Sequence, residues 1–525
     1  MISKIISSES FSITFLAFYA FWINWFSGNL GVMPIDTFSF FDSSYSILNN
    51  KLPIRDFWIF TGLVIDYLQV IFFLLFGLSW KSYIFHSSAI NILATLSFYY
   101  FLKSFNLKNF AIIVYCICFA TLCYPVAGTP FAYLHSYVFS LMTIFLFIFA
   151  VREQKNLSWF LLPVMFFVSF FSMQTPSTYI ILLVLIFSIY YFVKNKYFEN
   201  FKFFIFGSIF SLVIFIIFLF ITKTPLKNLI YQYFLFPLTI GEGRWSSDPS
   251  AYVTLLDQLN FKRLILNFKF IHLFYFPLFF LTFNLFFKKK SELIFVNVTI
   301  LISCFLFFIN QLMQANQIYI FSLIPILASV LHINLLSFKE NKKFLILIFC
   351  ILIFSTAKYH LRYNEDRKFI DIENKNKSIA VKGETIHKKL KYLNWVSSTS
   401  KNPNDEVNLI KKALILIKSD DRKKTLITNY QFFSLLLNTD LNILNRWYLW
   451  DNNTHPTENH KYFKFYKEMI NKNLKKNNVE VIYLFGAESE INFSNIVNYF
   501  DDICFKNNIV VKNKFSYHEI IDCKK

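Results

Sequence analysis

Residues 203–222 read FFIFGSIFSLVIFIIFLFIT, a run of 20 residues with no charged side chain. A helix needs about 20 mostly apolar residues to cross the hydrocarbon core of a bilayer. This run therefore predicts a membrane-spanning helix. Similar apolar runs recur along the chain and begin near Ser12, Phe57, Tyr83, Phe110, Ser136, Trp159, Tyr179, His272, Leu293, Ile318 and Phe344.

The composition agrees with a membrane protein. Of 525 residues, 55% are hydrophobic and only 16% are charged, and 52 Lys and Arg stand against 32 Asp and Glu. Soluble proteins usually carry about a quarter charged residues, so disorder, a small disulfide scaffold and a soluble nucleic-acid binder are excluded. A basic excess on an apolar chain is typical of cytoplasmic loops and of contact with anionic lipid. We therefore predict a multi-pass protein of the cell (inner) membrane, with lipid rather than nucleic acid as a partner.

The short loops between the apolar runs alternate in charge. One set is rich in lysine and arginine and contains Lys103, Lys108, Arg152, Lys155, Lys194, Lys196, Lys202, Lys288, Lys289, Lys290, Lys339, Lys342 and Lys343. The other set is nearly free of them and comprises residues 124–135, 174–177 and 310–317. The positive-inside rule places the first set in the cytoplasm and the second set outside.

One apolar run, residues 57–79, contains Asp66 and Gln69. A charged residue near the centre of a bilayer costs a few kcal/mol, whereas an amphipathic helix in the interface carries it without that cost. We therefore predict that this run is a juxtamembrane or re-entrant helix that does not cross. The expected architecture has about eleven spans, with the N-terminus in the cytoplasm and the C-terminus outside.

The domain organisation follows from this topology. Residues 1–357 are expected to form the membrane module, with outer loops at 28–82 and 222–269, and residues 358–525 an extracytoplasmic α/β domain. Within that domain, residues 424–429 and 479–485 are predicted as buried strands and 462–476 as an amphipathic helix. Cys504 and Cys523 lie in this polar region and could form a disulfide there, a pairing that the sequence leaves open.

The first outer loop holds the densest group of charged residues near a membrane: Asp36, Asp42, Lys51, Arg55 and Asp56. For Asp42 and Lys51 we expect ordinary solvated surface charges. Arg55 and Asp56 enter the interfacial helix and should lie at headgroup depth. There an arginine can hold a lipid-linked phosphate by paired hydrogen bonds, and a nearby carboxylate can accept a proton from an attacking hydroxyl.

This loop resembles the first outer loop of the GT-C glycosyltransferases, in the branch of protein-mannosyltransferase-like and aminoarabinose-transferase-like enzymes. The resemblance lies in Asp36, in the string Leu52-Pro53-Ile54-Arg55-Asp56-Phe57-Trp58, and in Gly62, Tyr67-Leu68 and Leu75-Phe76-Gly77. It covers roughly the first 200 residues. The chain departs from the family pattern at Thr37, Ile54 and Leu63, where the family often has an acid, a tyrosine and a proline.

The resemblance implies an inverting transfer of a sugar from a polyprenyl-phosphate donor to a glycan, lipid or protein acceptor outside the cytoplasm. Asp36 falls where the family has its essential aspartate, which serves as base or orients the acceptor. Arg55, with Arg244 or Lys223 as helpers, would bind the donor phosphate. Residues expected at the outer cavity or the acceptor are Asp56, His135, Gln174, Asn316 and Gln317.

Two of these residues also fit a purely structural role. His135 could be a hydrogen-bonded interfacial histidine, and Arg244 beside Trp245 could be an interfacial anchor. A transporter or flippase for a lipid-linked sugar or small solute is the alternative function, although such a protein would place charges within its spans. No grouping of His, Asp and Glu has metal-ligand spacing, so we predict no required metal or other cofactor.

Overall fold

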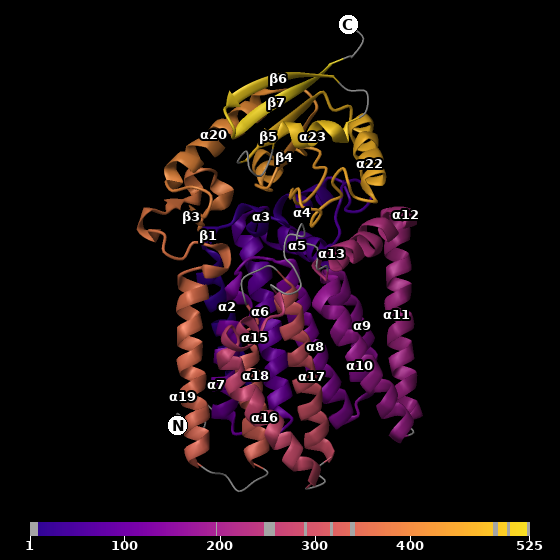
Figure 1. Ribbon diagram of the computed structural model, residues 1–525, viewed down its shortest axis with the longest axis vertical. Coiled ribbons are helices and arrows are strands. Elements are labelled where there is room, and N and C mark those ends of the chain that lie inside the picture. Colours follow the sequence, from indigo (N-terminus) through magenta and orange to yellow (C-terminus); the bar gives the residue numbers. More distant parts are fainter. Residues whose placement is uncertain are drawn as a thin grey trace. The chain divides into compact units, whose positions relative to one another are not determined.

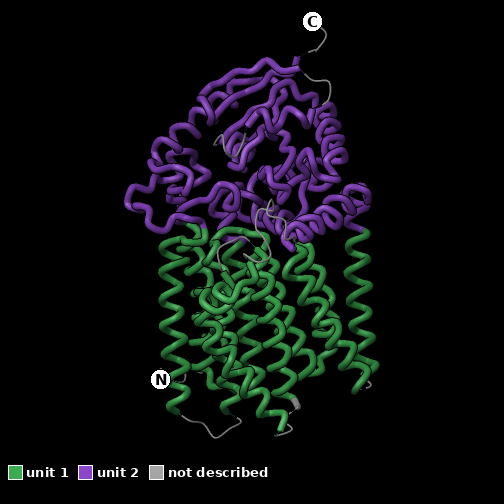
Figure 2. Tube along the Cα trace, viewed as in Figure 1, with its two compact units in different colours: residues 1–29, 87–216, 247–369 green, residues 30–86, 217–246, 370–525 purple. Residues whose placement is uncertain are grey.

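The computed structural model describes residues 9–195, 197–245, 258–287, 291–314, 319–336, 342–486, 492–500 and 504–521. The chain forms two compact units (Figure 2). Unit 1 comprises residues 1–29, 87–216 and 247–369, and unit 2 comprises residues 30–86, 217–246 and 370–525. Unit 2 therefore joins residues of the predicted first and second outer loops to the C-terminal region, a division that differs from the boundary expected at residue 357.

Unit 1 is built of helices (Figure 1). They are α2 (Glu9–Gly28), α7 (Asn109–Leu122), α8 (Ala132–Glu153), α9 (Asn156–Ser172), α10 (Gln174–Asn195), α15 (Phe261–Leu266), α16 (Lys269–Phe287), α17 (Ser291–Met313), α18 (Leu323–Leu336) and α19 (Lys342–Tyr359). Two longer helices, α6 (Trp80–Lys103) and α11 (Phe198–Thr222), have residues in both units.

Seven helices of the described chain are long and apolar enough to cross a membrane. They cover Asn109–Val126, Ala132–Glu153, Gln174–Lys194, Phe198–Thr222, Lys269–Phe287, Glu292–Met313 and Lys342–Ile370. The membrane class is thereby confirmed at the level of helix length and composition. The count of eleven spans stays a prediction, since α9 and α18 are apolar but only 17 and 14 residues long.

The helix predicted to lie along the membrane is α5 (Leu63–Phe76), which has 14 residues and lies in unit 2. Residues on its two sides pack on one another, because the ring of Phe41, before α5, contacts Trp80 and Tyr83, after it, at centroid distances of 6.5 and 5.2 Å. A helix that crossed a bilayer would separate its flanking residues by about 30 Å. These contacts support the prediction that α5 does not cross.

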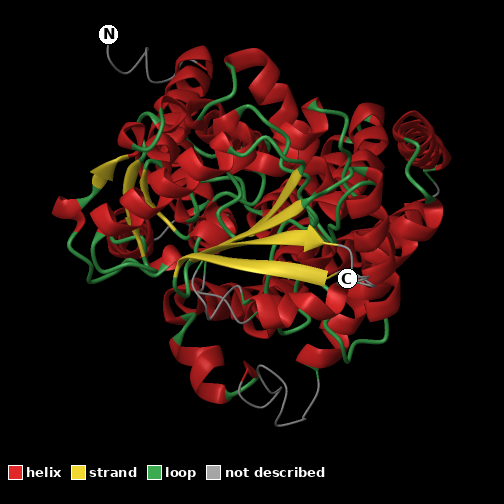
Figure 3. Ribbon diagram, turned by 90° about the horizontal axis from the view of Figure 1, so that it is seen from above, coloured by secondary structure: helices red, strands yellow, loops and turns green. Residues whose placement is uncertain are grey.

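Unit 2 contains two small sheets, visible as separate groups of strands in Figure 3. The first has the order β1-β3-β2, with β1 (Leu30–Val32) parallel to β3 (Asn394–Ser397) and β2 (Val381–Lys382) antiparallel to it. The second has the order β4-β5-β7-β6, with β4 (Lys424–Thr428) parallel to β5 (Val481–Phe485) and the rest antiparallel. The two predicted strands are thus confirmed as β4 and β5.

The remaining elements of unit 2 are short, apart from two helices. They are α3 (Pro34–Thr37), α4 (Phe41–Leu48), α12 (Leu226–Leu229), α13 (Phe236–Arg244), α20 (Pro403–Ser419), α21 (Phe433–Leu437), α22 (Phe463–Lys476), α23 (Phe493–Ile496), β6 (Cys504–Val511) and β7 (Phe515–Ile521). The helix α22 confirms the amphipathic helix expected at 462–476 and buries its apolar side, including Tyr466 and Ile470.

A single hydrophobic core joins the three chain segments of unit 2. Trp58 is fully buried, and its ring meets Phe236 at 5.3 Å and Tyr466 at 5.0 Å. The indole N–H of Trp58 donates to the carbonyl of Thr454 at 3.0 Å. Segments that share a core must lie on the same side of a membrane, so the loop before α5 and the C-terminal region are on one side.

Asp42 was expected to be a solvated surface charge, but it links the first loop to α21. Its carboxylate is 2% exposed and accepts hydrogen bonds from the main-chain N–H groups of Ser434 and Leu435, both at 2.9 Å. At the other end of α21, the Lys389 ammonium group donates to the carbonyl of Leu435 and to Asn438. The expectation for Asp42 is therefore wrong, because helix-end amides that need an acceptor bury this carboxylate.

We expect Asp42→Ala to lower the free energy of unfolding by about 2 kcal/mol, since the substitution leaves two buried N–H groups without an acceptor. Urea or thermal unfolding of the purified chain in detergent measures the change. Asp405→Ala, at an exposed position in the first turn of α20, serves as the control and should cost less than about 0.5 kcal/mol. Equal losses in the two variants would contradict a capping role.

Candidate functional site

Asp36 lies in α3, the short helix that follows β1. The turn is fixed locally, because the Thr37 hydroxyl accepts a hydrogen bond from the N–H of Met33 at 2.9 Å. The strand before it packs closely on residues 370–372. Gly31 has φ +77°, and a Cβ there would lie 2.3 Å from the Ile372 side chain, so only glycine allows this approach.

The carboxylate of Asp36 is half-buried and makes no hydrogen bond or ion pair with any described residue. Burial raises the pKa of this carboxyl to about 6, and the negative charge of Asp371 acts in the same direction. A carboxylate with a pKa near neutrality and a free acceptor is suited to accept a proton from a bound hydroxyl.

Arg55 and Asp56 form an ion pair that holds the loop together. Arg55 donates to the Asp56 carboxylate from Nε at 2.8 Å and Nη2 at 2.7 Å. The same guanidinium donates to the carbonyls of Thr222 at 2.9 Å and Asn50 at 2.7 Å. Most of its donors are therefore used by the protein itself, while the side chain keeps 25% exposure.

Asp56 is bound on all sides. Its carboxylate also accepts from the N–H of Leu52 at 2.9 Å and from the Lys476 ammonium group at 2.9 Å. Burial alone would raise its pKa, but the hydrogen bonds from Arg55, Leu52 and Lys476 lower it below the ordinary value. Asp56 is therefore ionised and fully occupied, an arrangement that favours positioning the loop over taking up a proton.

The other two predicted phosphate-binding residues also belong to unit 2. Lys223 is exposed and directly follows Thr222, whose carbonyl binds Arg55. Arg244 is the last residue of α13 and is half-buried. Unit 2 thus contains Asp36, Arg55, Asp56, Lys223 and Arg244.

The predicted cavity residues outside this group lie in unit 1. His135 is fully buried, and its Nδ1 is 2.5 Å from the Tyr124 hydroxyl and 3.3 Å from the carbonyl of Phe131. These contacts favour the structural, hydrogen-bonded role for this histidine over contact with a ligand. Gln174 is the half-buried first residue of α10. Asn316 and Gln317 lie outside the described residues.

The sequence missed a buried ion pair in unit 2 between Asp66 of α5 and Arg446. Both side chains are 0% exposed. Arg446 also donates to the carbonyl of Thr61 at 2.6 Å, and Asp66 accepts from the Ser43 hydroxyl at 2.5 Å. The sequence of residues 445–448 fits either contact with an acceptor or a surface turn, and it does not indicate an ion pair. The signal available was Asp66 itself, since a carboxylate in an apolar helix requires a partner.

No metal site is evident in the part of the chain that the structure describes, where no group of three or more His, Cys, Asp or Glu side chains is close enough to share an ion. In comparisons with known proteins, no family model matches the chain and no curated protein resembles it significantly. The function is therefore inferred from the geometry of unit 2 and from the loop motif.

Proposed function

We propose that this chain is an integral-membrane glycosyltransferase of the GT-C type. The observation that carries the proposal is the carboxylate of Asp36, half-buried and unpaired within the described residues, on the short helix α3 that follows α2 and β1. Unit 2 also contains the cationic residues Arg55, Lys223 and Arg244. Sugar transfer from a lipid phosphate requires a carboxylate base for the acceptor hydroxyl and cations that stabilise the leaving phosphate, and unit 2 contains residues of both kinds.

The proposed reaction is an inverting displacement at the anomeric carbon of the donor sugar. The acceptor hydroxyl gives its proton to Asp36 as its oxygen bonds to that carbon. The bond between the carbon and the donor phosphate oxygen breaks, and its electron pair leaves with the polyprenyl phosphate. The leaving phosphate gains negative charge, which Lys223 and Arg244 stabilise, while Arg55 and Asp56 hold the loop in place.

The proposed orientation places unit 2 on the extracytoplasmic side, with the N-terminus in the cytoplasm. The alternation of lysine-rich and lysine-poor loops along the sequence supports it by the positive-inside rule. A second support is Cys504, which is disulfide-bonded, since such bonds persist in oxidising compartments. Cys523 lies outside the described residues.

A transfer assay separates this function from its main alternative. The purified chain is reconstituted in vesicles with a polyprenyl-phosphate sugar that carries a radiolabel in the sugar. We expect the label to move from the lipid to an added glycan, lipid or protein acceptor fraction. Label that crosses the bilayer while still on its lipid would instead identify a flippase, and would overturn the transferase proposal.

The pH dependence of transfer should follow the ionisation of Asp36. Because burial raises its pKa to about 6, the carboxylate is ionised above that pH and protonated below it. We expect kcat/KM to fall about tenfold for each pH unit below 6 and to level off above 7. The measurement is kcat/KM from pH 4.5 to 8, with circular dichroism to confirm folding, and a flat profile would argue against this base.

A further inference from the structure

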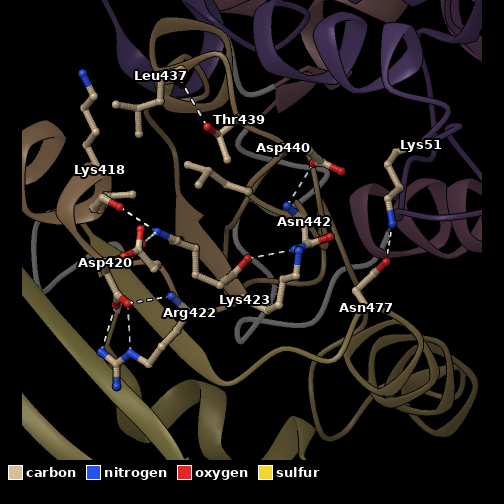
Figure 4. A pocket seen from close by; sticks show the side chains of 14 residues that line it. Lys51, Lys418, Asp420, Arg422, Lys423, Leu437, Thr439, Asp440, Asn442 and Asn477 are labelled. Carbon is tan, nitrogen blue, oxygen red and sulfur yellow. Dashed lines mark hydrogen bonds and ion pairs between the residues drawn. The ribbon is translucent and has the colours of Figure 1, made fainter.

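A cavity of about 520 Å³ opens in unit 2, and Asp36 is not among the residues that line it (Figure 4). Its walls come from the end of α20, the turn at 420–423, the start of β4, the turn at 439–442, the end of α22, and Lys51 of the first loop. The charged lining consists of five cations and three carboxylates: Lys51, Lys418, Arg422, Lys423, Lys424, Asp420, Asp421 and Asp440.

One pair of these charges is internally neutralised. Arg422 donates to Asp420 from Nε and Nη2, each at 2.9 Å, and the Tyr483 hydroxyl donates to the same carboxylate at 2.5 Å. In spite of its burial, these hydrogen bonds lower the pKa of Asp420 to about 2. Without Arg422 and Asp420, the charged lining of the cavity consists of four lysine ammonium groups and two carboxylates, those of Asp421 and Asp440.

Two of the ammonium groups are held in place by neutral oxygen atoms. Lys424 donates to the main-chain carbonyls of Ile417, at 2.7 Å, and Asp420. Lys51 donates to the side-chain oxygen of Asn477. Such contacts fix the position of each ammonium group, while the carboxylate of Asp421 acts on Lys424 and that of Asp440 interacts with Lys51.

The other two ammonium groups, on Lys418 and Lys423, are exposed and make no hydrogen bond or ion pair with any described residue. Of the remaining carboxylates, Asp440 is occupied by the N–H of Asn442 at 3.0 Å. The cavity therefore carries a net positive charge, part of it fixed and part of it on side chains free to move onto a ligand.

The size and the neutral lining narrow the class of ligand. A cavity of about 520 Å³ is much larger than a single phosphate and falls within the range of small-molecule sites. Its wall includes the hydroxyl of Thr439 and the amides of Asn442 and Asn477, groups that bind sugar hydroxyls.

We propose that this cavity, which has Lys51, Lys418, Lys423 and Lys424 in its lining, binds an anionic saccharide. The binding proposal is based on the lining of the cavity and does not depend on sugar transfer. Binding and transfer are measured in separate experiments, so a negative result in one does not contradict the other.

The test is isothermal titration calorimetry on the full chain in detergent, with glucose 6-phosphate and glucuronate as anionic probes and glucose and inorganic phosphate as controls. We expect both anionic sugars to bind at least about tenfold more tightly than glucose or inorganic phosphate, and their binding to weaken as salt is raised from about 0.05 to 0.5 M. Absent binding, or glucose bound equally well, would overturn the site. Inorganic phosphate bound equally well would overturn the saccharide assignment.

A pair of variants ties the binding to this cavity. Lys418→Gln with Lys423→Gln removes two exposed charges that make no structural contact with any described residue, and should weaken both anionic sugars at least about fivefold. The matched control, Lys512→Gln with Lys514→Gln, removes two exposed charges between β6 and β7 of the same unit. The control should bind as the parent chain does, and equal weakening in the two variants would show that only net charge matters and contradict the proposal.

Discussion

Asp36→Asn should reduce sugar transfer by about 10²- to 10⁴-fold, the usual contribution of a positioned general base. Asparagine matches aspartate in size but cannot take up the proton of the acceptor hydroxyl. Since the Asp36 carboxylate makes no hydrogen bond or ion pair with any described residue, its replacement removes no structural contact. The loss should therefore appear in kcat, with little change in membrane insertion or in the apparent Tm.

The matched control is Asp405→Asn, which removes one carboxylate from an exposed position in α20 of the same unit. Its transfer rate should equal that of the parent chain. Transfer is measured with the radiolabelled lipid-linked donor, and insertion by extraction of the protein from membranes. Near-normal turnover of Asp36→Asn would remove this residue from the mechanism. Whether the protein transfers sugar at all is decided separately, by the activity of the parent chain.

Arg446→Met should lower the free energy of unfolding by about 3–5 kcal/mol, because it leaves the Asp66 carboxylate buried without its cation. The space around the pair gives no room for rearrangement. Arg446 packs on the Phe40 ring at 4.4 Å, and a Cβ on Gly62 would lie within 2.7 Å of both side chains. Water therefore has little access to replace the lost partner.

The double variant Asp66→Leu with Arg446→Met separates the pair from its surroundings. Replacing both members of a buried ion pair by apolar groups is often close to neutral, so the double variant should recover most of the stability lost in the single one. Unfolding in detergent, followed by tryptophan fluorescence, gives the free energies of unfolding of the two single variants and of the double variant. A double variant as unstable as the sum of the two single variants would mean that the two charges do not act together.

The membrane class could be predicted from the sequence because length and apolarity alone define a spanning helix. The strands β4 and β5 and the helix α22 were also predicted, since their patterns are local. The presence of a helix at α5 was predicted in the same way, whereas its failure to cross the membrane stays a prediction. These features depend on residues close together in the chain.

The contacts between distant segments could not be predicted. Asp66 and Arg446 are separated by 380 residues, and Asp42 and Ser434 by 392. Hydrophobic periodicity carries no information about which segments meet, so Asp42 looked like a surface charge and Arg446 like part of a turn. The candidate site shows the same limit. Asp36 was predicted as a site residue from a sequence motif, whereas only the structure shows that the charge of Asp371 acts on it.

The pairing of β1 with β3 has a consequence for synthesis in the cell. Residues 30–32 leave the ribosome long before their partners at 394–397, and the Trp58 core needs residues up to 500. Domains generally fold as units during translation, so this one must wait until nearly the whole polypeptide has been inserted. During that interval the apolar side chains of residues 30–86, Trp58 among them, are without their C-terminal partners, and exposed apolar surface of this kind promotes aggregation.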